Sequence, residues 1–211
     1  MKVRRIIGHV LAVCLLSAHS FALDPSRALT QYGHTAWRIR DGYFSSAPLA
    51  IAQTKDGQLW LGGEGGLLHF DGVQFSPWKA PNGQPLPDER IFALFGASDG
   101  SLWVGTGSGL ARWKDGRLVT YARAGRFSSI VEDPHGTIWA GHTRGVGVVP
   151  PLCTFAGNDF KCFAISDQPL PGSAIVTALA VDHHGDLWIG TQSIASEAVR
   201  NAFHPRMCEP D

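Results

Sequence analysis

Two cysteines in the sequence are spaced for a disulfide bond. Cys153 and Cys162 close the segment CTFAGNDFKC, whose midpoint falls between Gly157 and Asn158. Gly-Asn is an accepted two-residue hairpin turn, and a hairpin folded there places the two cysteines opposite each other. Directly opposed residues can have Cα atoms about 4.5 Å apart, within reach of a disulfide. The sequence therefore predicts a Cys153–Cys162 disulfide with Cys208 unpaired; two free thiols are the alternative.

Paired carboxylates are a second group that could do chemistry, as the acid and base of a glycosidase. Asp56, Asp71, Asp99 and Asp115 stand in Asp-Gly steps between β-prone runs, where Asp is a turn former. Four further acids are scattered along the sequence, namely Asp41, Glu64, Glu132 and Asp186. No spacing among them predicts a catalytic pair, so we expect no catalytic residue in this chain.

The nine histidines could in principle ligate a metal ion. His135 and the pair His183-His184 lie directly before turn glycines, at places where other parts of the sequence have Asp. A turn residue that tolerates positive φ explains these positions. No histidine stands at a zinc-ligand spacing from Cys or a carboxylate. We therefore expect no metal and no cofactor.

A short motif occurs four times in the sequence, in the segments KDGQLWLGG, SDGSLWVGT, PHGTIWAGH and HHGDLWIGT. Asp56, Asp99 and the turn histidines lie within it. Its tryptophans are 43, 36 and 49 residues apart, a period typical of solenoids and propellers. The motif residues are Gly57, Trp60, Gly62, Gly100, Trp103, Gly105, Gly136, Trp139, Gly141, Gly185, Trp188 and Gly190.

Each motif unit has the content of one propeller blade. The first unit contains four β-prone runs, LAIAQT, QLWLG, LLHF and VQFSPW, separated by glycine-containing turns. Asp-Gly between such runs predicts a type I′ hairpin turn, with positive φ at both central residues. Four short antiparallel strands per period describe a blade. We therefore expect an all-β, partial β-propeller of about four four-stranded blades, the last incomplete, with units near residues 50–78, 91–121, 128–163 and 174–192.

The motif tryptophans have a structural explanation in this fold. Adjacent residues of a strand point to opposite faces of the sheet, and both faces of a blade are covered by neighbouring blades. We expect the tryptophans to pack between blades, with ligand stacking as the alternative. Other aromatic residues fall near strand ends, where some could face a ligand at a channel mouth; these are Phe75, Trp78, Trp113 and Tyr121.

The segments DGQLWLGGEGGLLHFDGVQF and DGSLWVGTGSGLARW resemble the two-component regulator propeller repeat, over roughly residues 28–192. That repeat occurs in the exported sensor region of bacterial histidine kinases. The resemblance implies a propeller that senses an extracytoplasmic signal. In longer relatives it is joined to a membrane helix and a cytoplasmic output domain, and such relatives have many more blades.

The C-terminal residues depart from the repeat. After DLWIGT the sequence continues as QSIASEAVRNAFHPRMCEPD, without a Gly-Leu step, an Asp-Gly turn or a fourth strand. We interpret residues 193–211 as a divergent tail and the chain as an N-terminal piece of a longer sensor. A small protein with a natural divergent tail is the alternative.

The first 22 residues have the pattern of a secretory signal peptide. A basic start is followed by the apolar run IIGHVLAVCLL and by small residues, which predicts cleavage between Ala22 and Leu23; an anchor helix is the alternative. Residues 23–49 form a lead-in with the first strand, and residues 50–192 hold the repeats. Cleavage leaves 15 basic and 18 acidic residues, a balance that argues against a nucleic-acid partner.

Taken together, the sequence predicts an exported, periplasmic input region of a two-component signalling protein. We expect its ligand to be a small molecule or carbohydrate and its contact with the membrane to run through a missing C-terminal part. A propeller lyase or glycosidase, or a passive secreted interaction scaffold, are the alternatives.

Overall fold

The structure is a computed structural model of the 211-residue chain. It describes residues 36–122, 125–143, 151–156, 159–163, 175–192 and 201–203. The chain divides into two compact units, Met1–Ala36 and Trp37–Asp211, and the description below concerns the second. The predicted cleavage site at Ala22 and Leu23, and Cys208, lie outside the described residues.

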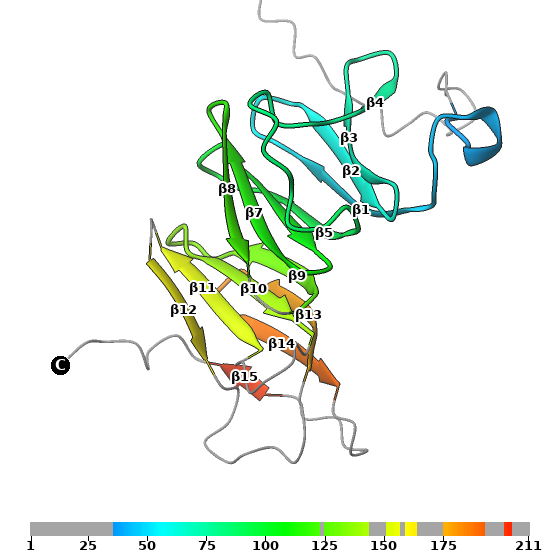
Figure 1. The fold of residues 1–211 in the computed structure, drawn as a ribbon. Helices are drawn as coiled ribbons and strands as arrows, with labels where there is room; N and C mark the ends of the chain where they lie inside the picture. Colours follow the sequence, from blue (N-terminus) through cyan, green and yellow to red (C-terminus); the bar gives the residue numbers. More distant parts are fainter. Residues whose placement is uncertain are drawn as a thin grey trace, which may run out of the picture. The chain divides into compact units, whose positions relative to one another are not determined.

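The described strands form four antiparallel sheets that follow one another along the chain (Figure 1). The first blade contains β1 (Pro48–Gln53), β2 (Leu59–Gly63), β3 (Gly66–Phe70) and β4 (Phe75–Pro77). The second contains β5 (Ile91–Gly96), β6 (Leu102–Thr106), β7 (Gly109–Lys114) and β8 (Arg117–Ala122). A short 3-10 helix, η2 (Ile39–Asp41), precedes the first blade. In each blade every strand pairs with its neighbour in sequence, as expected for blades built from consecutive hairpins.

The third and fourth blades differ in their outer strands. The third contains β9 (Phe127–Glu132), β10 (Ile138–His142), β11 (Leu152–Ala156) and β12 (Asp159–Phe163). The fourth contains β13 (Ile175–Val181), β14 (Leu187–Gln192) and β15 (Asn201–Phe203), in the order β13-β14-β15. The fold is therefore a partial β-propeller with an incomplete last blade. The third strand of this blade, β15, lies in the segment that we interpreted as a divergent tail, and it pairs with β14 through Leu187 and Phe203.

The turns correct the expectation of type I′ geometry at every Asp-Gly step. Among the described residues other than glycine, Asp115 alone has a positive φ, 48°, and with Gly116 it forms the two-residue β7–β8 turn. The Asp56-Gly57 step closes a longer loop, in which the N–H of Gly57 donates to the Thr54 carbonyl and that of Thr54 to the Gln58 carbonyl. Only the glycine is left-handed there, as in a type I turn followed by a G1 bulge.

The hydrophobic core consists of three clusters, one between each pair of consecutive blades. The first strands contact one another in succession, β1 with β5, β5 with β9 and β9 with β13. The second strand of each blade also contacts the first strand of the next, as β2 does with β5 and β6 with β9. Leu102 and Trp103 show the consequence of strand alternation, because Leu102 joins the cluster shared with the first blade and Trp103 the cluster shared with the third.

Candidate functional site

The four motif tryptophans stand on the second strand of each blade, and the first three face the next blade along the chain. Trp60, Trp103 and Trp139 are 5%, 3% and 8% exposed, and each belongs to the cluster shared with the following blade. Trp188 is 50% exposed. Three of the tryptophans are therefore inter-blade packing residues, and the fourth presents the same side chain with half of it uncovered.

The indole N–H groups of three motif tryptophans have a recurring acceptor six residues earlier. Trp60 Nε1 donates to the Thr54 hydroxyl at 3.0 Å, and Trp139 Nε1 donates to Asp133 Oδ2 at 3.0 Å. Trp188 Nε1 donates to Asp182 Oδ2 at 2.9 Å. These bonds matter because a buried indole N–H without a partner is costly. At Trp60 and Trp139 the acceptor residue thus fixes the orientation of the indole ring against the neighbouring blade.

Asp133 and Asp182, which were not among the candidate residues expected from the sequence, also organise the preceding turns. The other carboxylate oxygen of Asp182 accepts the backbone N–H groups of His184 and Asp186, at 2.9 and 3.0 Å. Asp133 does the same for His135 and Thr137. The hydrogen bond from Trp188, aided by the turn N–H groups, lowers the pKa of Asp182. A signal was present in the sequence, since both aspartates stand three residues before a motif glycine.

The motif glycines after each Trp give room for a side chain of the next blade. A Cβ added at Gly62 would come within 2.8 Å of Ile91 Cβ, and one at Gly141 within 2.8 Å of Val176 Cβ. At Gly105 the added atom would lie 2.6 Å from the Phe127 carbonyl oxygen. Real Cβ atoms do not approach other atoms this closely. Glycine is therefore required at these positions by the close approach of two blades, with no demand on φ.

The most extensive charged cluster in the described chain surrounds Asp99. Its Oδ1 accepts the N–H and hydroxyl of Ser101, at 2.9 and 2.6 Å, while Oδ2 accepts from Lys114 at 3.0 Å and from Arg112. Burial alone would raise the pKa of Asp99, but these hydrogen bonds outweigh it and hold the pKa well below the usual range. Asp99 is thus a fixed anion that ties the β5–β6 turn to β7. An acid held ionised in this way is unsuited to donate a proton near neutral pH.

The other aspartates of the Asp-Gly steps act in their turns. Asp56 Oδ1 accepts from the Thr54 hydroxyl and the Gln58 N–H, and the Thr54 bond is the main cause of its lowered pKa. Asp71 Oδ1 accepts the N–H groups of Val73 and Gln74, which lower its pKa as well.

The scattered acids have separate local surroundings. Asp41, the last residue of η2, pairs with Arg38 at 4.0 Å and with Arg40 at 3.8 Å. Glu132 connects two blades, because its carboxylate accepts the N–H and hydroxyl of Ser98 at 2.7 and 2.6 Å. Glu64 lies in the β2–β3 turn and Asp186 directly before β14. The described contacts do not assemble these residues into an acid–base pair.

His135, His183 and His184 are exposed residues in the turns before β10 and β14. The rings of His183 and His184 are 3.7 Å apart between centroids. Across the part of the chain that the structure describes, no three His, Cys, Asp or Glu side chains gather closely enough to hold a metal ion.

The aromatic residues near strand ends mostly contact one another. Trp78, in the connection between the first two blades, meets Trp60 and Trp113 edge to face, at 6.0 and 4.9 Å between centroids. Tyr121 lies 5.9 Å from Trp103 in a stacked arrangement, and Phe75 lies 4.8 Å from Phe70. These contacts place the four residues in packing roles.

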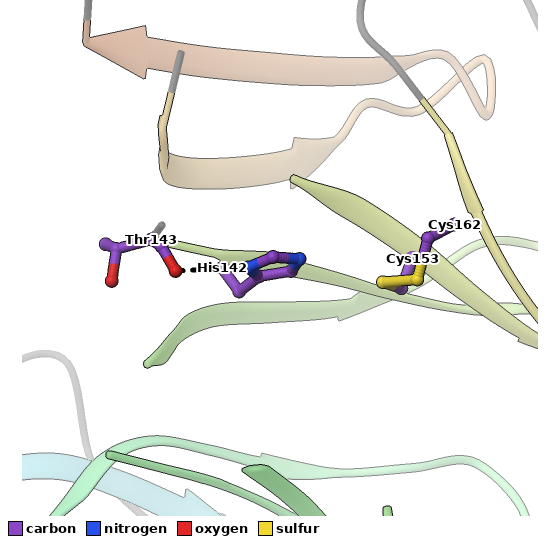
Figure 2. Close-up of a disulfide and its surroundings, with 4 residues drawn as sticks. All are labelled: His142, Thr143, Cys153 and Cys162. Atoms are coloured by element: carbon purple, nitrogen blue, oxygen red, sulfur yellow. Dashed lines mark hydrogen bonds between the residues drawn. A yellow bond between two sulfur atoms is a disulfide. The ribbon is translucent and has the colours of Figure 1, made fainter. Parts of the chain in front are cut away.

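The disulfide joins the two outer strands of the third blade (Figure 2). Cys153 on β11 pairs directly opposite Cys162 on β12, and the hairpin register is the one that the sequence predicts, including Phe155 opposite Phe160. The turn residues 157 and 158 lie outside the described residues. Cys153 is fully buried in the cluster between the second and third blades, so the bond fixes the outer hairpin where that interface forms.

A fully buried polar residue lies in the same blade. His142 is 1% exposed, and its ring Nδ1 donates to the Thr143 carbonyl oxygen at 3.1 Å (Figure 2). Its ring centroid is 5.1 Å from that of Phe127.

A hollow beside the first blade is lined by residues including Phe44, Ser46, Pro48 and Leu61, and its volume is about 10 Å³. That is room for about one water molecule. Among the described residues, there is also no helix with the length and apolar content needed to span a membrane.

Comparisons with known proteins agree with this architecture. The model of a protein family described as two component regulator propeller matches residues 85–108 and 169–193. No curated protein matches the chain.

Several solved structures share the fold. The extracellular domain of a hybrid two-component system from B. thetaiotaomicron matches with a TM-score of 0.54 and 23% identity, over 68% of this chain and 20% of that one. A second such domain from the same organism matches with a TM-score of 0.53 and 20% identity, over 74% and 22%. A gluconolactonase from Xanthomonas campestris matches with a TM-score of 0.50 and 16% identity, over 74% and 61%.

The chain spans about a fifth of the length of the two extracellular domains. At these identities the likeness concerns the fold, and it is the fold of a β-propeller. The repeated Trp and Gly positions, the four successive blades and the family match lead to one conclusion: the chain carries two-component regulator propeller repeats, and it resembles part of the extracellular propeller domain of hybrid two-component systems.

Proposed function

We propose that this chain is the exported, ligand-sensing region of a two-component signalling protein, acting on the periplasmic side of the membrane. The observation that carries the proposal is the repeat itself. The family match covers the segments that contain the second and fourth motif units, and each of the four motifs lies on the second strand of its own sheet.

The chemistry of the chain supports an exported location. A Cys153–Cys162 disulfide is stable in an oxidising compartment and rare in the cytosol. The N-terminal residues carry the charge and hydropathy pattern of a signal peptide. We expect the mature protein to begin at Leu23, which N-terminal sequencing of exported protein would establish.

The ligand in this proposal is a small molecule or a carbohydrate, and the complete protein transmits its binding to an output domain through a membrane helix. Binding acts by differential affinity for two states of the complete protein. Formal net charge is zero, which supports a partner other than nucleic acid.

Two other functions use the same fold. A propeller lyase or glycosidase requires a carboxylate pair with an environment that keeps one member protonated. In this chain Asp99 is instead held ionised by its neighbours. A passive interaction scaffold requires only the blades. The sensing function differs from both in needing a continuation into an output domain.

The experiment is to sequence the transcript and follow the reading frame at and beyond codon 211. Sensing predicts further repeats, a membrane-spanning helix and a kinase or similar output domain in the same frame or in a directly adjacent displaced frame. A transcript that ends there, with neither repeats nor an output domain downstream, would contradict the proposal and favour the scaffold.

A further inference from the structure

The two ends of the series of blades each present large apolar side chains that the described chain leaves uncovered. At the fourth blade Trp188 is 50% exposed, and at the first blade Leu49 and Ile51 are 51% and 64% exposed. Trp188 and Ile51 stand at positions that are covered by a neighbouring blade elsewhere in the chain. The exposed faces can therefore be compared, residue by residue, with the three interfaces that the chain already forms.

The exposed face of the fourth blade carries the motif Trp and Gly that, in the other blades, contact the first strand of the following blade. Trp188 corresponds to Trp139, which is 8% exposed because the fourth blade covers it. Gly190 corresponds to Gly141, which Val176 approaches closely. A Cβ at Gly190 would meet its own sheet alone, the nearest atom being Ala178 Cβ at 3.3 Å. We call the space over the motif glycine that follows each Trp the glycine notch; Val176 fills it at Gly141. The glycine notch at Gly190 is open among the described residues.

The exposed face of the first blade carries the first-strand apolar residues that, in other blades, pack against the preceding blade. Ile51 pairs with Leu61 on the neighbouring strand as Leu94 pairs with Val104 and Leu179 with Ile189. Leu94 and Leu179 are both buried against the preceding blade. Pro48 stands before a register shift between β1 and β2, at the position that Ile91 and Val176 occupy in their blades. Ile91 and Val176 are the residues that fill the glycine notches.

The segment before the first blade completes this likeness. Trp37 meets Phe70 edge to face, with centroids 5.3 Å apart and an interplanar angle of 78°. Trp78 meets Trp113 in the same way, at 4.9 Å and 73°. Phe70 and Trp113 are equivalent, since each follows the residue paired with a motif Trp. Trp78 also contacts Trp60 of the preceding blade, so Trp37 is placed to contact a Trp on a blade docked before the first.

We propose that these two faces bind each other between copies of the chain, so that the fourth blade of one copy receives the first blade of a second. The contact continues an interface that the chain builds three times within itself. It is head-to-tail, and two copies joined this way contain eight blades, the upper end of the usual range for a closed propeller. Two identical contacts then close a two-fold ring and leave no open face. The proposal concerns self-association and does not rest on the sensing function.

The test uses sedimentation equilibrium of the oxidised chain. The parent chain is expected to have twice the mass of one chain. Ile51→Glu and Trp188→Lys should each weaken association by at least about 30-fold, as loss of a central apolar contact does. The lysine introduced by Trp188→Lys would keep a hydrogen-bond partner for Asp182, which protects the local fold. Val73→Glu is the matched control, because Val73 is 79% exposed in the turn between β3 and β4 and stands on neither β1 nor β14, and it should leave the dimer intact.

Mixing the two monomeric variants makes the test specific for head-to-tail binding. One contact of the mixed dimer is then of parent type, and the other brings the introduced glutamate against the introduced lysine, so dimers should return. A parent chain that is monomeric at tens of micromolar would overturn the proposal. The exposed faces of the first and fourth blades would then be covered by further blades of a longer chain. Dissociation by Trp188→Lys but not by Ile51→Glu would overturn it in favour of a symmetric contact. Oligomers longer than two copies would overturn the closed ring.

Discussion

The inter-blade packing is tested most sharply by one substitution made at two equivalent glycines, Gly141→Ala and Gly190→Ala. Both glycines stand two residues after a motif Trp, and neither has a positive φ. Backbone strain therefore enters neither variant. The two variants differ in what the added methyl group meets.

At Gly141 the methyl group would overlap Val176, which is fully buried and fixed in β13. Overpacking of this kind costs about 1–3 kcal/mol. At Gly190 the nearest atom is 3.3 Å away and has to give by only a few tenths of an ångström. Alanine also lowers the entropy of the unfolded chain, which stabilises both variants by about 0.4–1 kcal/mol. We expect Gly141→Ala to lower the free energy of unfolding by about 1–2 kcal/mol and Gly190→Ala to change it by less than about 0.5 kcal/mol.

The assay is urea unfolding followed by tryptophan fluorescence, with both variants made in the Ile51→Glu background so that association between copies does not contribute. The midpoint should fall for Gly141→Ala, with an unchanged slope. Equal losses for the two variants, or a larger loss for Gly190→Ala, would refute the reasoning, because the fourth blade would then have its notch filled within one chain.

Three further predictions concern single interactions. Trp103→Ala should lower the free energy of unfolding by about 3–5 kcal/mol in urea titrations, since Trp103 is 3% exposed in the core; a near-neutral effect would assign it another role. Reduction of the Cys153–Cys162 bond should cost about 2–3 kcal/mol, and peptide mapping of oxidised protein should find these two residues linked. The lowered pKa of Asp99 means that its ionised form stabilises the fold above the unfolded pKa near 4, and that this contribution is lost as the pH falls through the folded pKa. Asp99→Asn should therefore lower stability at pH 7 and flatten its fall below about pH 4, as measured by urea titrations at several pH values; an unchanged acid profile would contradict this.

Much of the fold was predictable because its determinants are local. A glycine turn, a hydrophobic-Trp step and a second glycine recur at a blade-sized period, and each requirement can be read within a few residues. The β11–β12 register was predictable for the same reason, since CTFAGNDFKC contains both its turn and its paired cysteines.

The parts that escaped prediction depend on contacts between distant residues or on exact turn geometry. The aspartates that accept from Trp139 and Trp188 were missed because their role appears only when the turn is a type I turn with a left-handed glycine. The Asp99 cluster was missed because its cations come from β7. β15 lies in a segment without a turn signal of the repeat type. The exposure of Trp188 follows from the absence of a covering blade in the described chain, which no local pattern around that residue reveals.

The most direct test of the sensing function is calorimetric titration of the oxidised chain with panels of small metabolites and of neutral and acidic oligosaccharides, followed by mass spectrometry of the recovered compounds. The account predicts saturable binding of one chemical class, with the ligand recovered unchanged. Recovery of cleaved or isomerised ligand would contradict it in favour of an enzyme. Failure of every compound to bind more tightly than about 1 mM, an affinity of about −4 kcal/mol, would contradict it in favour of a scaffold.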